Sequence, residues 1–324
     1  MSDPARCLQL GFAGTPEFAV PALNALASTR HELRAVFTQP DRPAGRGRKL
    51  QSSAVKLRAG ALGLKVYQPV SCKLPEVRDI ISELQLDALV VVAYGLILPP
   101  KVLTLPRLGC LNIHASLLPR WRGAAPIQRA LLAGDSASGV TIMRMEEGLD
   151  TGPMLAARSI DMAPGETAKT LHDRLASLGS ELLCETLDAL VAGRGHETPQ
   201  PVSGVTYAEK IAKSEALIDW QEDAVNILRR IRAFNPWPIA QTQLRGAPLR
   251  IWEAELGQTQ VLGAAAAGTV LSASPAGIEV ACGRGILRIA RLQLPGRRAL
   301  SAAEFLRATP LAGARFDTAR RCEI

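Results

Sequence analysis

An amide and an imidazole stand two residues apart near the middle of this sequence. Asn112 and His114 end the apolar run that begins at Cys110. Side chains alternate across a β-strand, so residues two apart face the same way. A carboxamide can donate a hydrogen bond to a developing oxyanion, and an imidazole can move protons. The pair is typical of acyl-transfer chemistry, but an Asn in a turn beside a packed His gives the same pattern.

A carboxylate in a later loop could complete such a site. Asp150 lies between Gly148 and Gly152, in a segment flanked by two apolar runs. It could orient His114 or accept a proton during the reaction. It could equally stabilise its own loop as an Asx-turn residue, because Asp favours such turns. The residues alone leave both interpretations open.

A cluster of positive charge follows the second apolar run. Residues 41–49 contain Arg42, Arg46, Arg48 and Lys49, interrupted by Pro and Gly. Cations on a flexible loop can follow the phosphates of a nucleic-acid backbone. The alternative is an ordinary solvated loop, which the same composition would also produce.

The elements that must position these residues alternate between strands and helices. We expect strands over 8–14, 33–38, 65–67, 87–93, 110–114, 139–145 and 154–160, and helices over 15–27, 53–62, 74–84 and 167–191. Thr15 is the expected N-cap of the first helix, and residues 39–50 are expected to form a loop. Strands that are apolar along their whole length indicate a mostly parallel sheet with helices on both faces. The predicted fold class is therefore α/β and Rossmann-like.

The last third of the chain changes character. Residues 193–203 are polar and rich in Gly and Pro, and one helix is expected over 224–232. Short strand patterns then recur over 240–244, 249–252, 268–272, 277–281 and 286–294. About five short strands with turn residues between them predict a small, OB-like β-barrel. We expect a catalytic domain over 1–192, a linker over 193–209 and a barrel domain over 210–324.

Composition limits the functions that the chain could have. The 324 residues are 47% hydrophobic, and the N-terminal residues lack the apolar stretch of a signal peptide. We therefore expect a soluble, cytoplasmic protein with no membrane partner. The six cysteines form no C-x-x-C pair, which argues against structural zinc. Gly11-Phe12-Ala13-Gly14 lacks the glycine spacing of a dinucleotide-binding turn, which disfavours a nicotinamide cofactor.

Positive charge is concentrated towards the C-terminus. The formal net charge is +8, and from Lys210 onward 16 Lys and Arg oppose 10 Asp and Glu, a net +6. The first 209 residues hold 22 against 20, a net +2. Such an uneven distribution favours a polyanionic partner, although a basic surface also serves solubility.

Taken together, these motifs resemble the methionyl-tRNA formyltransferase family over nearly the whole chain. The resemblance lies in Phe12–Ala19, Gln39–Gly47, Asn112–Pro126, Gly148–Gly152, Tyr207–Ile211 and Ala233–Pro238. The segments around Asn112 and Asp150 are similar to those of other folate-dependent formyltransferases. The basic loop and the C-terminal segments are similar to those of the enzymes that act on tRNA.

The resemblance implies roles for particular residues. Asn112, His114 and Asp150 would be catalytic, and the formyl donor would be 10-formyltetrahydrofolate, with no metal and no nicotinamide. The folate would be bound by two segments, contributing Ser116, Leu117, Leu118 and Pro119, and Tyr94, Gly95, Ile97 and Leu98. Initiator methionyl-tRNA would be bound by Arg42, Arg46, Arg48, Lys49 and Lys210. We expect the enzyme to be a monomer.

Three other functions are compatible with parts of the pattern. A related formyltransferase could act on a glycinamide ribonucleotide or a nucleotide sugar, but those relatives lack this basic loop and basic barrel together. An RNA-binding protein with a vestigial catalytic domain is disfavoured by the intact Asn112, His114 and Asp150. A nicotinamide oxidoreductase is the weakest alternative.

Overall fold

The structure is a computed structural model that describes residues 7–44, 49–257, 265–311 and 313–317. The chain forms two compact units. The first contains the residues up to Pro126 together with Ala137–Asp161 and His172–Ala208. The second contains Ile127–Ser136, Met162–Leu171 and the residues from Glu209 onward.

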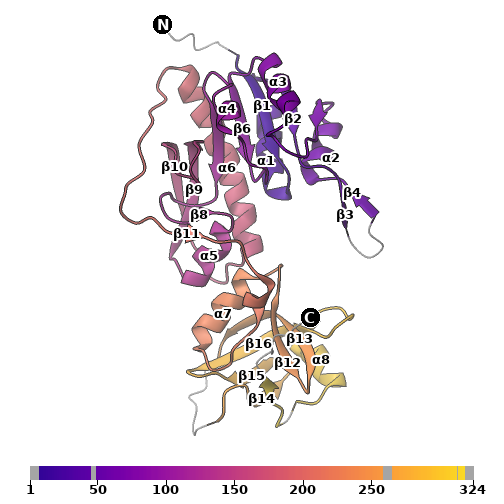
Figure 1. Ribbon diagram of the computed structural model, residues 1–324. Helices are drawn as coiled ribbons and strands as arrows, with labels where there is room; N and C mark the ends of the chain where they lie inside the picture. The colour runs from indigo at the N-terminus through magenta and orange to yellow at the C-terminus, as the bar shows by residue number, and fades with distance from the viewer. Residues whose placement is uncertain (1–6, 45–48, 258–264, 312, 318–324) are drawn as a thin grey trace. The chain divides into compact units, whose positions relative to one another are not determined.

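A seven-stranded sheet forms the centre of the first unit (Figure 1). Its order is β10 (Met154–Asp161), β9 (Ala137–Arg144), β7 (Cys110–His114), β6 (Ala88–Val92), β1 (Gln9–Gly14), β2 (Glu32–Phe37) and β5 (Val66–Tyr67). From β7 to β5 every pairing is parallel, whereas β9 runs antiparallel to both of its neighbours. The mostly parallel sheet expected from the sequence is confirmed.

Helices cover this sheet on both faces because its strands are apolar on both faces. Leu89 and Cys110 belong to a buried cluster that includes side chains of α3 (Pro75–Glu83) and α4 (Pro100–Leu103). Ile113 points to the opposite face, where Gly179 of α6 (Ala168–Val191) lies so close that a Cβ there would be 2.7 Å from Ile113 Cγ2. This alternation places Asn112 and His114 on the same face as Cys110.

The start of the first helical segment differs from the prediction. Thr15 is not an N-cap, because Pro16 precedes a 3-10 turn, η1 (Glu17–Ala19), and α1 (Val20–Ala27) follows it. The Thr15 hydroxyl instead donates a hydrogen bond to the carbonyl oxygen of Tyr94, 2.8 Å away. The hydroxyl that was expected to cap the helix is therefore bound to a residue far away in the sequence. Ser53 does cap α2 (Ala54–Ala61), accepting from the Lys56 amide at 3.0 Å.

The basic segment expected to be a loop contains a short hairpin. β3 (Arg42–Ala44) pairs antiparallel with β4 (Lys49–Gln51). Its base is fixed by Asp41, whose carboxylate accepts from Lys56 Nζ at 2.7 Å and from Gln68 Nε2 at 2.8 Å. The hydrogen bond from Lys56 is the main cause that lowers the pKa of Asp41. No periodic pattern predicts strands of three residues, which explains the error.

The second unit contains an antiparallel sheet of short strands. Its order is β14 (Val270–Ser274), β15 (Gly277–Ala281), β16 (Ile286–Gln293), β13 (Ala247–Leu256), β12 (Ala240–Leu244) and β18 (Phe316–Asp317), with β17 (Leu300–Ser301) beside β16. The two outermost strands also meet, because Thr269 and Arg315 form an antiparallel bridge. Val270 donates to the Ala314 carbonyl at 2.9 Å, and Phe316 donates to Gly268 at 2.8 Å. The barrel expected from the sequence is confirmed.

Apolar side chains fill this barrel and hold two helices against it. Trp220 is 1% exposed, and its indole Nε1 donates to the Thr242 hydroxyl at 2.9 Å. Side chains of α7 (Ala224–Ala233) and α8 (Ala302–Ala308) share the buried cluster. The remaining short elements are β8 (Arg122–Gly123), α5 (Pro126–Ala133), β11 (Tyr207–Ala208) and η2 (Lys213–Ala216). Within the described residues, no helix is long and apolar enough to cross a membrane.

Candidate active site

The imidazole of His114 lies at the carboxyl end of β7, where ligands of parallel α/β sheets bind. The residue is 5% exposed, so its ring is held inside the protein. Its Nε2 atom lies 2.9 Å from the carbonyl oxygen of Trp121. A carbonyl oxygen only accepts, so Nε2 carries a proton and Nδ1 of the neutral ring is the basic nitrogen. The hydrogen bond thus fixes the orientation of the ring, with the basic Nδ1 atom on the side away from the Trp121 carbonyl.

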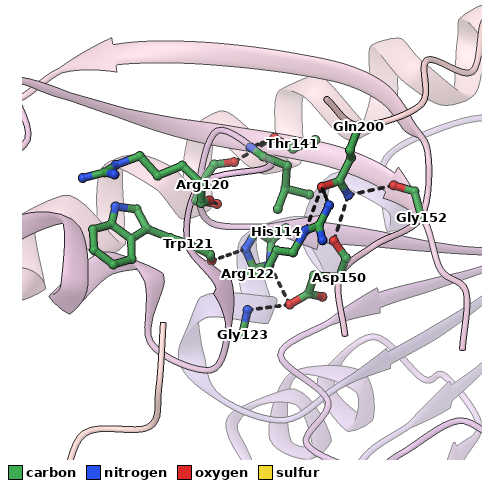
Figure 2. Close-up of polar contacts among 11 residues, drawn as sticks. His114, Arg120, Trp121, Arg122, Gly123, Thr141, Asp150, Gly152 and Gln200 are labelled. Carbon is green, nitrogen blue, oxygen red and sulfur yellow. Dashed lines mark hydrogen bonds and ion pairs between the residues drawn. The ribbon is translucent and has the colours of Figure 1, made fainter. Parts of the chain in front are cut away.

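Asp150 faces that basic nitrogen. Its Oδ2 atom lies 3.7 Å from His114 Nδ1 and accepts a hydrogen bond from the Gly123 amide at 2.8 Å (Figure 2). The Asp150 backbone has a φ of +51°, a left-handed conformation that Asp adopts more readily than most residues. The structure therefore brings His114 and Asp150 together, as the enzymatic interpretation requires.

Asn112 lies two residues before His114 on the same strand. It pairs through its backbone with Val91 on one side and Met143 on the other. Strand alternation directs its side chain to the face that carries His114. The residue is partly exposed, which leaves it open to a substrate at this edge of the sheet.

The loop after β7 is fixed by its own polar groups. The Ser116 hydroxyl donates to the Arg120 carbonyl at 2.6 Å, and the Thr141 hydroxyl donates to the Ser116 carbonyl at 2.7 Å. The Leu118 amide donates back to the Thr141 hydroxyl at 3.1 Å. Trp121 follows with a φ of +62°, and its carbonyl oxygen lies 2.9 Å from His114 Nε2. A bulky residue keeps such a conformation only when its surroundings fix it.

A segment far along the chain completes this loop. The Thr206 hydroxyl accepts from the Trp121 amide at 2.9 Å, and the Thr206 carbonyl accepts from the Arg122 amide at 2.9 Å. Strand β11 then pairs in parallel with β8. Sequence reasoning missed this contact, because a two-residue ladder leaves no pattern in either segment. Thr206, which lies in the connecting segment over 193–209, thus also contributes to the site.

Gln200 is the second functional candidate that sequence reasoning missed. Its Oε1 atom accepts from Arg122 Nε at 3.0 Å and from Nη2 at 2.7 Å. Its Nε2 atom donates to the carbonyl oxygens of Asp150 and Gly152, each at 2.8 Å. Figure 2 shows this carboxamide between the Arg122 guanidinium and the Asp150 loop. The signal in the sequence is a Gln between two prolines, Pro199 and Pro201.

The residues expected to bind folate have different environments. In the loop after β6, Tyr94 and Leu98 are buried, and Ile97 is exposed. Gly95 has a φ of +79°, and a Cβ there would collide with the Gln39 side chain. In the loop after β7, Ser116 and Leu118 are buried, Leu117 packs against Gly139, and the Pro119 carbonyl accepts from the Thr206 amide at 3.4 Å. Both loops follow carboxyl ends of parallel strands.

The residues expected to bind tRNA are only partly described. Arg42 on β3 is exposed, and so is Lys210 in the second unit. Lys49 lies on β4, and nothing is described of its side chain. Arg46 and Arg48 lie outside the described residues. Over the described ranges, no group of three or more His, Cys, Asp or Glu could hold a metal ion.

Comparison with known families identifies the class of protein. Residues 8–187 match the family described as "Formyl transferase", and residues 210–310 match "Formyl transferase, C-terminal domain". The chain therefore has the two-part organisation of a formyl-group transferase.

Curated relatives define the family more closely. A protein of Methylococcus capsulatus named "Methionyl-tRNA formyltransferase" is 56% identical over 311 residues, covering 96% of this chain and all of the relative. One of the same name from Aromatoleum aromaticum is 55% identical, covering 97% of this chain and 98% of the relative. The chain belongs to the methionyl-tRNA formyltransferase family.

Solved structures share the fold at low sequence identity. HypX from Aquifex aeolicus superposes with a TM-score of 0.65 at 17% identity, over 94% of this chain and 48% of HypX. The sugar 3N-formyl transferase WlaRD superposes with a TM-score of 0.64 at 17% identity, over 91% of this chain and all of WlaRD. At these identities the similarity concerns the fold alone.

Proposed function

We propose that this protein transfers the formyl group of 10-formyltetrahydrofolate to the α-amino group of the methionine on initiator methionyl-tRNA, and so prepares that tRNA for translation initiation. It acts in the cytoplasm as a monomer. The amine attacks the formyl carbon, a tetrahedral oxyanion forms, and the folate nitrogen leaves as the carbon–nitrogen bond to the carrier breaks. One proton leaves the amine and one is gained by the folate nitrogen.

Asn112 stabilises the oxyanion in this scheme. Its carboxamide is a neutral donor on the face of β7 that carries His114, and it is accessible from solvent. A fixed donor aimed at a developing negative charge acts without reorganisation at the moment of reaction. Removal of one such donor lowers the rate about 10²–10³-fold.

His114 and Asp150 manage the protons. Because Nε2 of His114 is committed to the Trp121 carbonyl, Nδ1 is the atom that accepts the amine proton. The Asp150 carboxylate, 3.7 Å away, stabilises the imidazolium that results. His114 then returns the proton to the leaving folate nitrogen. General acid–base assistance of this kind contributes about 10²–10⁴ in rate.

The two substrates are bound by different parts of the chain. Ser116–Pro119 and Tyr94–Leu98 are the loops at the carboxyl ends of β7 and β6, and we assign folate binding to them. Arg42, Arg46, Arg48 and Lys49 contact the acceptor end of the tRNA. The domain over 210–324, with its net +6 charge and Lys210 at its start, binds the RNA backbone.

One observation carries this proposal. His114 and Asp150, 36 positions apart in the sequence, lie 3.7 Å apart at the carboxyl end of β7, in a chain that matches methionyl-tRNA formyltransferases over nearly its full length. The Asp150 carboxylate beside the His114 imidazole, with Asn112 on the same face of β7, makes a set of groups suited to acyl transfer to an amine.

The test is a formylation assay with 10-formyltetrahydrofolate and a panel of acceptors. We expect formyl transfer to charged initiator methionyl-tRNA and none to uncharged initiator tRNA. An amino-sugar nucleotide and a glycinamide ribonucleotide serve as the competing acceptors. Faster formylation of either small acceptor than of the charged tRNA would refute the proposed substrate. Binding of tRNA without any formyl transfer would instead support a vestigial catalytic domain.

A further inference from the structure

Residues 197–208 run along the loops that carry the candidate catalytic groups. Glu197 forms an ion pair with Arg144 at the end of β9. Thr198 and Met154 exchange two backbone hydrogen bonds, each 2.8 Å long. Thr206 then binds the Trp121 loop. The segment is therefore attached on both sides of Gln200, and its path past the Asp150 loop is fixed.

The Gln200 carboxamide uses its full hydrogen-bonding capacity in this place. Its oxygen accepts twice from the Arg122 guanidinium, and its nitrogen donates to two backbone carbonyls. A guanidinium only donates and a carbonyl only accepts, so the amide has one allowed orientation. A glutamate could accept from Arg122 but could not donate to the two carbonyls. An apolar residue could form none of these hydrogen bonds. The site therefore selects glutamine by its chemistry.

Two prolines restrict the backbone that presents this side chain. Pro199 has a fixed φ, and Pro201 disfavours the helical conformation at Gln200. The backbone around Gln200 consequently has less conformational freedom to lose on folding.

We propose that Gln200 is a positioning residue for the catalytic carboxylate, an assignment that depends on the proposed formyl transfer. The two N–H groups of its carboxamide donate to the carbonyl oxygens of Asp150 and Gly152. Both carbonyls belong to the turn in which Asp150 has a φ of +51°. These bonds keep the turn left-handed and aim the Asp150 carboxylate at the Gly123 amide and at Nδ1 of His114. Gln200 itself does not contact the reacting atoms.

Kinetics with two Gln200 variants test this assignment. Gln200→Glu keeps an acceptor for Arg122 and loses both donors to the Asp150 loop, and Gln200→Leu loses both functions. We expect kcat to fall about 10- to 100-fold in each, as for other residues that orient a catalytic group, with the KM for methionyl-tRNA within about twofold of the native value. Val202→Ala, on the same segment at a residue 96% exposed, is the control and should leave kcat unchanged.

A readout independent of activity separates this assignment from the proposed reaction. Hydrogen exchange of the Gly123 amide, followed by NMR, reports its bond to Asp150. We expect faster exchange in Gln200→Leu, approaching that in Asp150→Ala, and native exchange in Val202→Ala. Native exchange in Gln200→Leu, or a kcat of Gln200→Glu within about twofold of the native value, would overturn the assignment. A native enzyme without formyl transfer would refute the reaction, while the exchange data would still decide whether Gln200 positions Asp150.

Discussion

The Nε2 atom of His114 donates a hydrogen bond to the backbone carbonyl of Trp121, 2.9 Å away. This contact determines which ring nitrogen is basic, because a neutral imidazole with its proton on Nε2 accepts only at Nδ1. Nδ1 is also the nitrogen that faces Asp150. A backbone group thus orients the imidazole, and the carboxylate remains available to stabilise charge.

Asn112→Ala should lower kcat about 10²–10³-fold, because it removes the donor that we assign to the oxyanion. Binding of methionyl-tRNA should persist, as measured by filter binding. Asn226→Ala, at an exposed position of α7, is the control and should retain native kcat. Equal loss of turnover and of tRNA binding would reject the catalytic role of Asn112.

Gly123→Ala should disrupt β8 and with it the Asp150 contact. Gly123 has a φ of +116°, and an added Cβ would lie 2.9 Å from the Ala208 carbonyl oxygen. We expect a loss of about 1–3 kcal/mol in the free energy of unfolding, together with reduced kcat. Gly60→Ala in α2 has open space around it and should stabilise by up to about 1 kcal/mol. Urea titrations of the two variants measure the difference, and equal midpoints would contradict the prediction.

Arg42→Ala should weaken binding of tRNA through loss of a phosphate contact. Arg42 is exposed on the basic hairpin whose base Asp41 fixes. We expect a higher KM for methionyl-tRNA and a salt dependence of log KM flatter by about 0.7–0.9 per decade of salt. Arg78→Ala, an exposed cation on α3, should change neither. An unchanged salt slope in Arg42→Ala would exclude this contact with the RNA backbone.

Glu215→Gln should destabilise the second unit in a pH-dependent way. The Glu215 carboxylate accepts from Arg129 Nη1 at 2.6 Å and from Nη2 at 3.1 Å, and this hydrogen bonding is the largest cause that lowers its pKa from 4.5. The stabilisation is therefore fully present above the ordinary pKa and is lost as pH falls through the lowered one. We expect Glu215→Gln to cost about 1 kcal/mol at pH 7, because solvent screens this partly exposed pair.

Thermal melts at a series of pH values check the sign of that effect. The difference in Tm between the native protein and Glu215→Gln should shrink as the pH falls below 4.5, because the native carboxyl then becomes protonated. Glu76→Gln, at an exposed position of α3, should show no such trend. A difference that grows on acidification would contradict the ion-pair explanation.

The central sheet could be predicted because burial leaves a plain pattern in the sequence. Ala88–Val92 is buried at every position, and a short run rich in Val with no polar residue is typical of a strand covered on both faces. The residue types left the role of Asp150 open, and its place beside His114 was predicted only through the family resemblance. Elements with no period were missed, such as the three-residue strands of the basic hairpin. α5 was also missed, although Pro126 at its first position is a helix-start signal.

The supporting contacts of the site could not be predicted, because they join distant segments. Thr206 and Gln200 bind residues 85 and 50 positions away in the sequence, respectively. The composition of residues 193–209 predicts a polar linker. No pattern within that segment indicates which distant residues it contacts. Thr15 was misassigned for the same reason, since its acceptor lies on Tyr94, 79 positions away.

The bridge between Thr269 and Arg315 has a consequence for how this chain behaves in a crowded solution. A sheet with open borders presents rows of unpaired amides and carbonyls, which can recruit strands from other molecules into aggregates. Here residues 268–270 and 314–316, at the two borders of the sheet, form backbone hydrogen bonds with each other. A chain shortened before Ala314 would lose these contacts and expose the start of β14, so such truncation should promote self-association even though it leaves the loops around His114 and Asp150 untouched.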